Sequence, residues 1–139
     1  MEINKNILQQ IQQIILTAKD RAVRSVDFER VMMYWQIGQV IFEEEQKGME
    51  RAEYGKYLIQ SISDELQPQF GSGFSKRQLY RYVQFYRTFP NVSALQTQFS
   101  WTQYKILLSI DNEDKRAFYM AESSKNNWSA RQIPAISAK

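Results

Sequence analysis

The sequence contains no cysteine and no histidine. Without cysteine, disulfides and thiolate metal sites are impossible, and nothing indicates an oxidising compartment. Without histidine, the chain lacks the commonest general base and the commonest metal ligand. Five glycines and three prolines are too few for a long linker. We therefore expect no metal, no cofactor and no chemistry that depends on either missing residue.

Long apolar runs are also missing. Between Met1 and Thr17, isoleucines alternate with glutamines and asparagines, which fits neither a signal peptide nor a membrane span. Apolar residues nevertheless make up 43% of the 139 residues, enough for one folded core. We expect a single cytoplasmic domain over residues 1–139 that makes no membrane contact.

The charge is distributed unevenly along the chain. Residues 1–73 carry eight basic and eleven acidic side chains, whereas residues 74–139 carry ten basic and four acidic ones. No acidic residue occurs from Leu66 to Ile110, although five basic residues do. Such a segment can approach a polyanion at low electrostatic cost, although an acid-free stretch can also arise by chance or serve solubility.

Apolar residues recur at helical spacing almost throughout, and no segment alternates like a strand. A first helix is predicted from about Ile3 to Arg24, and its apolar face should pack in the core, although the spacing would also suit a short coiled coil. A second is predicted from about Asp27 to Lys47. The face of the first helix consists of Ile7, Ile11, Ile14 and Ala18.

The second predicted helix has an unusually wide apolar surface, which suggests a central position or a surface shared with a second subunit. Gly38 lies within this helix and lowers its stability by about 1 kcal/mol relative to alanine. A close crossing with another helix at this position would compensate for that loss. Gly48 should end it. The main stripe is Val31, Tyr34, Trp35, Gly38, Ile41 and Phe42, widened by Met33, Ile37 and Val40.

Three later helix starts share one pattern, in which an apolar residue precedes a serine and glutamine follows three residues after it. The serines are Ser75, Ser100 and Ser129. This pattern is typical of a capping box with a hydrophobic staple. A helix before them should span about Ala52 to Gln67 and be stopped by Pro68 and the Gly71-Ser72-Gly73 stretch, and another should begin at Asp111 or Asn112. The fold class predicted is therefore all-α, an orthogonal bundle of six to seven short helices.

No catalytic set emerges from the remaining residue types. The run Glu43–Glu45 lies near a helix end, and its side chains point in different directions, which is typical of a solvated face. Glu113-Asp114-Lys115 superficially matches the E-x-K of metal-dependent nucleases, but it begins a helix rather than ending a strand. We expect neither catalytic nor metal-binding residues, so the chain should not be an enzyme by itself.

The predicted helix from Ser75 to Phe89 has the one arrangement of residues in the chain that points to a binding function. Leu79, Tyr82, Val83 and Tyr86 should face the core, which leaves a basic stripe on the other side. Together with the helix before it, this forms a helix-turn-helix-like pair, whose second helix would enter the major groove. The alternative is an ordinary solvated helix. The predicted nucleic-acid-binding residues are Lys76, Arg77, Tyr80, Arg81, Gln84 and Arg87.

Several strings resemble the N-terminal domain of the YhcG family. They include Met33-Tyr34-Trp35-Gln36-Ile37-Gly38, the segment from Phe70 to Leu79, and Trp128-Ser129-Ala130-Arg131-Gln132. The resemblance runs from about Ile7 to Ile133. Near the end, Pro134 departs from the family pattern and should stop the last helix.

The resemblance implies a bacterial protein in which this helical domain precedes a PD-(D/E)XK-type nuclease domain. No such domain occurs within these 139 residues. The function predicted is a nucleic-acid-binding module, with double-stranded DNA as the expected partner. The alternative is a protein–protein or self-association module, with the first two helices forming a homodimer.

Overall fold

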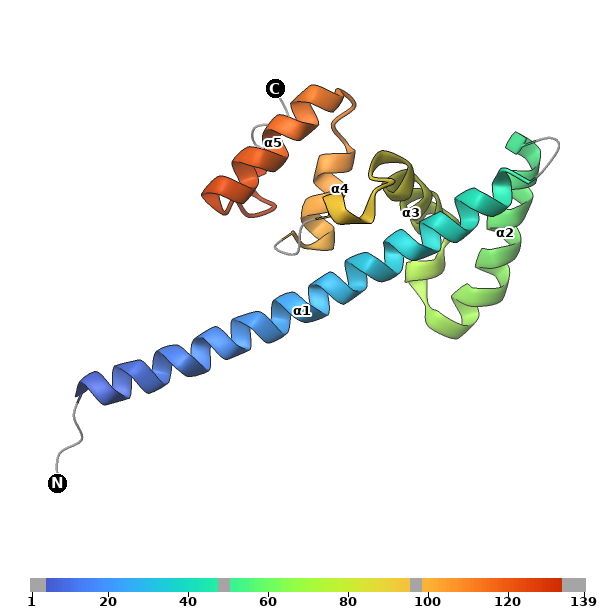
Figure 1. Ribbon diagram of the computed structural model, residues 1–139. Helices are drawn as coiled ribbons and strands as arrows, with labels where there is room; N and C mark the ends of the chain where they lie inside the picture. The colour runs from blue at the N-terminus through green and yellow to red at the C-terminus, as the bar shows by residue number, and fades with distance from the viewer. Residues whose placement is uncertain (1–4, 48–50, 96–98, 134–139) are drawn as a thin grey trace.

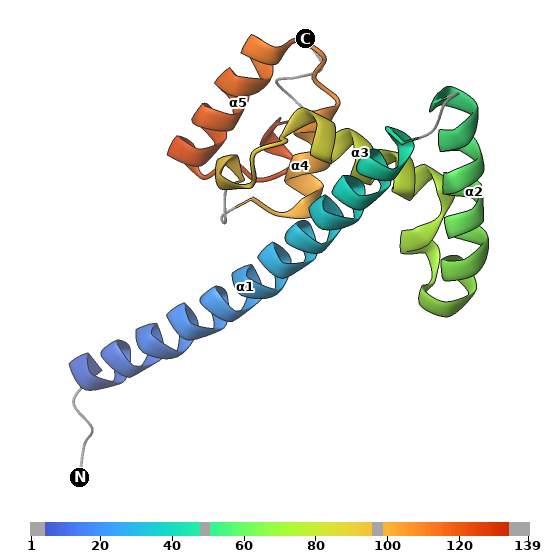
Figure 2. The same ribbon diagram turned by 45° about the vertical axis from the view of Figure 1, so that its right-hand side comes forward.

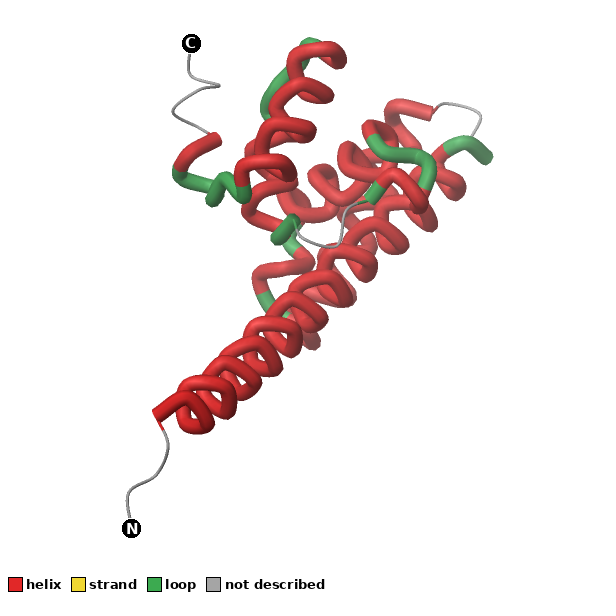
Figure 3. Tube along the Cα trace, turned by 60° about the vertical axis from the view of Figure 1, so that its left-hand side comes forward, coloured by secondary structure: helices red, strands yellow, loops and turns green. Residues whose placement is uncertain are grey.

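A computed structural model describes residues 5–47, 51–95 and 99–133 (Figure 1). Its α-helices are α1 (Lys5–Glu45), α2 (Arg51–Phe70), α3 (Lys76–Thr88), α4 (Trp101–Leu108) and α5 (Glu113–Asn126), and its 3₁₀ turns are η1 (Ser72–Phe74) and η2 (Val92–Ala94). Figure 3 shows only helices and loops in this part of the chain. The all-α prediction is confirmed. The prediction of six to seven short helices is not, because the described residues form five α-helices and the first is 41 residues long.

Helix α1 passes without a break through the point where two helices were predicted to meet. The second helix was predicted to begin at about Asp27, but an aspartate caps a helix only where the chain leaves the helical path. No glycine or proline occurs nearby to force that departure, and an ion pair between Arg24 and Asp20 bridges one turn (3.1 Å). The predicted break between Arg24 and Asp27 is therefore wrong.

The N-terminal half of α1 projects away from the rest of the fold (Figures 1 and 2). From Leu8 to Val26 every side chain except that of Thr17 is exposed. Ile11 and Ile14, predicted to lie in the core, are 49% and 67% exposed. That prediction is wrong, because the described helices leave these side chains uncovered.

The core lies against the C-terminal half of α1. One cluster joins Val31 and Trp35 to buried residues of α3, α4 and the loops around them, and a second joins Ile41 to α2 and α3. Helix α3 therefore contributes to both clusters. Its fully buried side chains include Leu79 and Phe85.

Gly38 lies where α1 crosses α3, as predicted. A Cβ atom at this position would overlap the carbonyl oxygen of Tyr82 and lie 2.6 Å from its carbonyl carbon. The two backbones can approach this closely only because glycine has no side chain. The ring of Tyr82 then stacks on that of Tyr34, with centroids 4.3 Å apart.

The predicted helix starts with a capping serine are confirmed where the structure describes them. Ser75 and Ser100 accept hydrogen bonds from the backbone N–H groups of Gln78 and Gln103, and at Ser100 the reciprocal bond completes the capping box. Ser129 N–H donates to the side chain of Gln132 (2.6 Å). Asn112, rather than Asp111, caps α5 by accepting from the N–H of Lys115.

The Gly71-Ser72-Gly73 stretch ends α2 as predicted, but Pro68 does not. It lies in the last turn, and the helix continues to Phe70 before Gly71 turns the chain with a φ of 94°. One missing N–H is tolerated this close to the end, and glycine adopts the left-handed conformation without strain.

Two predicted stops, Gly48 and Pro134, lie outside the described residues. Among the helices that the structure describes, none combines the length and the apolar character needed to cross a membrane.

Candidate nucleic-acid interface

Helix α3 is held rigidly on its buried side. Tyr82 donates a hydrogen bond from its hydroxyl to the carbonyl of Gly73 (2.7 Å), which ties α3 to the turn before it. Burial raises the pKa of the Tyr82 hydroxyl above its usual value, so it remains a donor. Phe85 packs against Trp101 and Tyr104 of α4, with centroids 5.2 and 5.0 Å apart.

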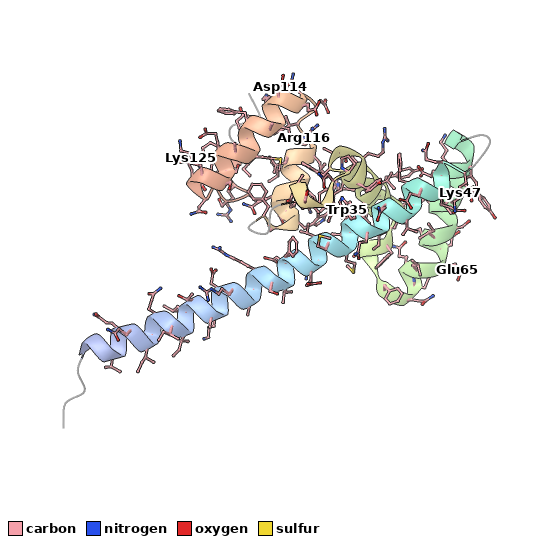
Figure 4. The ribbon with its side chains drawn as sticks, in the orientation of Figure 1. Trp35, Lys47, Glu65, Asp114, Arg116 and Lys125 are labelled. Carbon is pink, nitrogen blue, oxygen red and sulfur yellow. The ribbon has the colours of Figure 1, made fainter. Side chains whose placement is uncertain are left out.

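The C-terminal end of α3 is anchored to α1. The indole N–H of Trp35 donates to the carbonyl of Phe89 (2.7 Å), and Figure 4 shows Trp35 where α1 meets the rest of the fold. Burial raises the pKa of the Glu45 carboxyl on α1, and the charge of Arg87 lowers it by a smaller amount. This end of α3 therefore has a fixed position and a nearby acid.

The predicted core face of α3 is mostly correct. Leu79, Tyr82 and Val83 are buried, and Tyr86 is half-buried at the edge of Trp35. The prediction missed Phe85, which has no exposed surface. The sequence contained a signal for it, because position 85 lies at the edge of an apolar arc of about 160° that also holds positions 79, 82, 83 and 86.

The six predicted binding residues share the remaining side of α3. Lys76, Arg77, Tyr80, Gln84 and Arg87 are exposed, and Arg81 is half-buried at their edge. Successive helix residues turn by about 100°, so the five exposed positions fall within about 100° of the circumference. We call these six residues the basic face.

Gln84 has a structural partner that the sequence did not reveal. Its side-chain nitrogen donates to the carbonyl of Leu108 at the end of α4 (3.3 Å). This bond joins α3 to α4 and occupies part of the amide. The side-chain oxygen remains available as an acceptor.

The positive charges of the basic face have no ion-pair partner within the described residues. The two ion pairs found there join Arg24 to Asp20 and Lys47 to Glu44. Helix α3 itself contains no acidic residue, and its first turn is therefore open to an anion. Among the exposed groups, Tyr80 adds an aromatic ring that is 47% exposed.

No metal centre is apparent in the part of the chain that the structure describes, where no cluster of three or more carboxylates could hold an ion. Glu113 and Asp114 occupy the first turn of α5, where the helix dipole stabilises negative charge. In the acidic run, Glu44 accepts hydrogen bonds from the Tyr54 hydroxyl (3.0 Å), which lowers its pKa. These acids therefore have structural partners.

The family model called DUF1016 N-terminal domain matches residues 10–137, almost the whole chain. The chain belongs to the DUF1016 N-terminal domain family. The predicted resemblance is thereby confirmed, since this match coincides with a second one to a YhcG protein.

The DUF1016 N-terminal domain described here is 30% identical to a protein of Escherichia coli (strain K12) named "Putative nuclease YhcG", over 86% of this chain. The alignment spans 40% of the length of that relative. No solved structure matches the domain. The comparisons thus connect this DUF1016 N-terminal domain to one region of a larger nuclease-related protein.

Proposed function

We propose that this domain binds nucleic acid through the basic face of α3. The observation that carries the proposal is that four cations and an exposed tyrosine share one side of α3 and form no ion pair with a described acid, although Glu45 lies near Arg87. Cations left without partners on a pre-positioned helix can release counterions from a phosphate backbone, which drives such binding.

Arg77 and Arg81 are the central phosphate contacts in this proposal. They lie one turn apart, so their Cβ atoms are separated by about 5–6 Å and their side chains project side by side. The N–H groups of the first turn that Ser75 does not cap, together with the helix dipole, add to the attraction. Lys76 and Arg87 extend the positive surface along the helix.

Double-stranded DNA is the partner that we propose. In this proposal α2 and α3, which the residues from Gly71 to Ser75 connect, act as a helix-turn-helix-like unit, and the first turns of α3 enter the major groove. Arginine can grip guanine and tyrosine can bind phosphate. Gln84 contributes through its side-chain oxygen, because its nitrogen already binds α4.

Catalysis is proposed to lie elsewhere in the longer relatives. The relative is named as a nuclease, the alignment covers 40% of its length, and the described residues of this domain hold no carboxylate cluster for a metal. We propose that this domain is not an enzyme but delivers nucleic acid, in the cytoplasm, to a cutting domain. Plasmid DNA incubated with the domain and Mg²⁺ should remain intact.

The test is the double variant Arg77→Ala/Arg81→Ala, measured by fluorescence anisotropy on labelled duplex DNA, single-stranded DNA and RNA at several salt concentrations. Both side chains lie off the core, so the melting temperature should stay near that of the parent. Affinity for duplex should fall, and the salt dependence should lose roughly 0.9 units of slope for each phosphate contact removed.

Arg21→Ala/Arg30→Ala is the matched control, because it removes the same charge from exposed positions on α1. It should leave affinity and slope close to those of the parent. Equal losses in the two double variants would mean that net charge alone drives binding. No loss in the α3 variant would exclude the basic face as the binding surface.

A further inference from the structure

An apolar stripe runs along the projecting half of α1. Its members follow one another at spacings of three or four residues and therefore lie on one side of the helix. The four large ones are between 41% and 60% exposed. The stripe consists of Leu8, Ile11, Ile15, Ala18, Ala22 and Val26.

None of the described helices of the same chain covers this stripe. Counting about 100° per residue, it lies roughly opposite the side of α1 on which Val31, Trp35 and Gly38 meet the core. Most helical stability in proteins comes from packing an apolar face rather than from helix propensity. Exposed apolar surface of this extent marks an interaction site.

We propose that the stripe packs antiparallel against the same stripe of a second copy of the chain. The large residues occupy its N-terminal half and the small ones lie mainly toward its C-terminal half. Antiparallel pairing about a centre between residues 16 and 17 sets Ile15 against Ala18 and Ile11 against Ala22. These two pairs set a large side chain against a small one, which fills space better than alanine against alanine, and Leu8 lies near Val26 at each end of the pair.

The distribution of charge along α1 supports the same arrangement. Residues 8–18 carry no charge, whereas the next six residues hold Asp20, which pairs with Arg24, and a net excess of positive charge from Lys19, Arg21 and Arg24. Antiparallel pairing places these cations beside the uncharged, glutamine-rich half of the partner. Parallel pairing would bring identical charges to the same level of the pair, which is unfavourable.

Antiparallel pairing also leaves both cores undisturbed. The overlapping segments of the two helices would end near residue 26, before the buried residues that begin at Val31. The two helical domains would lie at opposite ends of the pair, so the second copy would not compete with α3 for its place on α1.

Sedimentation of the 139-residue chain tests the pairing. At micromolar concentration the parent should show twice the 16.5 kDa mass of one chain. Ile15→Asp should weaken association by roughly tenfold or more. Leu16→Asp is the control, because Leu16 is 61% exposed on the same helix but lies about 100° away from Ile15. A parent mass of 16.5 kDa, or equal effects of the two variants, would overturn the proposal.

Because the chain has no native cysteine, disulfides between introduced cysteines can report the relative orientation of the two helices. Chains carrying Ile15→Cys and Ala18→Cys, mixed and oxidised, should form a mixed disulfide. Ala22→Cys alone should not dimerise covalently, since antiparallel pairing separates the two positions by about 16 Å along the axis. A disulfide between two Ala22→Cys chains with no mixed product would show a parallel pair and overturn the antiparallel arrangement.

Discussion

The two halves of α1 are one continuous helix with opposite environments. In the C-terminal half, Val31 and Ile41 are buried against the other helices, and Gly38 touches the backbone of α3. In the N-terminal half, Leu8, Ile14 and Val23 are all exposed. Both halves have helical apolar spacing, so spacing alone does not say whether an apolar face is covered.

The difference teaches that helix formation and burial are separate properties here. The helical path continues because no residue near Arg24 to Asp27 breaks it, and this is a local property. Burial requires other helices to arrive, and those come from residues after Arg51. Three predictions separate the two halves experimentally.

The largest effect should come from Trp35→Ala in the packed half. Trp35 is 7% exposed and donates its indole N–H to Phe89, so truncation leaves a cavity and an unpaired carbonyl. We expect a loss of about 3–5 kcal/mol in the free energy of unfolding. Urea unfolding measures it. Leu16→Ala in the projecting half should stay within about 0.5 kcal/mol, and similar losses in both variants would contradict the contrast.

A smaller loss should follow from Gly38→Ala. Alanine favours a helix by about 1 kcal/mol over glycine, but its methyl group would overlap the backbone of Tyr82. Separating α1 from α3 should cost more than that gain, with a net loss of about 1–3 kcal/mol by thermal unfolding. A variant more stable than the parent would show that the two backbones do not touch at this point.

The smallest expected effect is the difference in unfolding free energy between the variants Ala22→Gly and Gln36→Gly. Both positions are exposed on α1, and glycine costs a helix about 0.5–1 kcal/mol at each. In the packed half this cost should lower the unfolding free energy of the domain. In the projecting half of a dilute chain it should reduce only the helical circular dichroism signal. An equal shift in unfolding midpoint for both would mean that the two halves unfold together.

Features that depend on neighbouring residues along the chain were predicted well. Ser75 and Ser100 cap α3 and α4 as their spacing with Gln78 and Gln103 indicated. Capping is encoded within four residues, so it can be recognised without the fold. Gly38 was predicted only in part. Glycine destabilises a helix, which implied that another helix passes close to this position, but the sequence did not indicate that the contact is with Tyr82.

Features that depend on which helices meet were predicted less well. Tyr86 was expected in the core and is half-buried, while Phe85 was overlooked and is fully buried between α3 and α4. The bond from Gln84 to Leu108 joins residues 24 apart, and no local pattern encodes it. The basic face was predicted residue by residue, since charge and helical spacing are both visible in the chain. That this face binds nucleic acid remains a prediction.

The sequence by itself therefore determined the helical class, the serine-capped starts of α3 and α4, and the side of α3 on which its cations gather, because each depends on interactions within a few residues. Only the tertiary structure decided that Leu8 to Val26 would project while Val31 to Phe42 formed the core. Both segments are helical and apolar. Their environments differ because α3 reaches α1 at Gly38, where the backbones can touch, and the described helices leave the apolar side chains of the N-terminal half exposed.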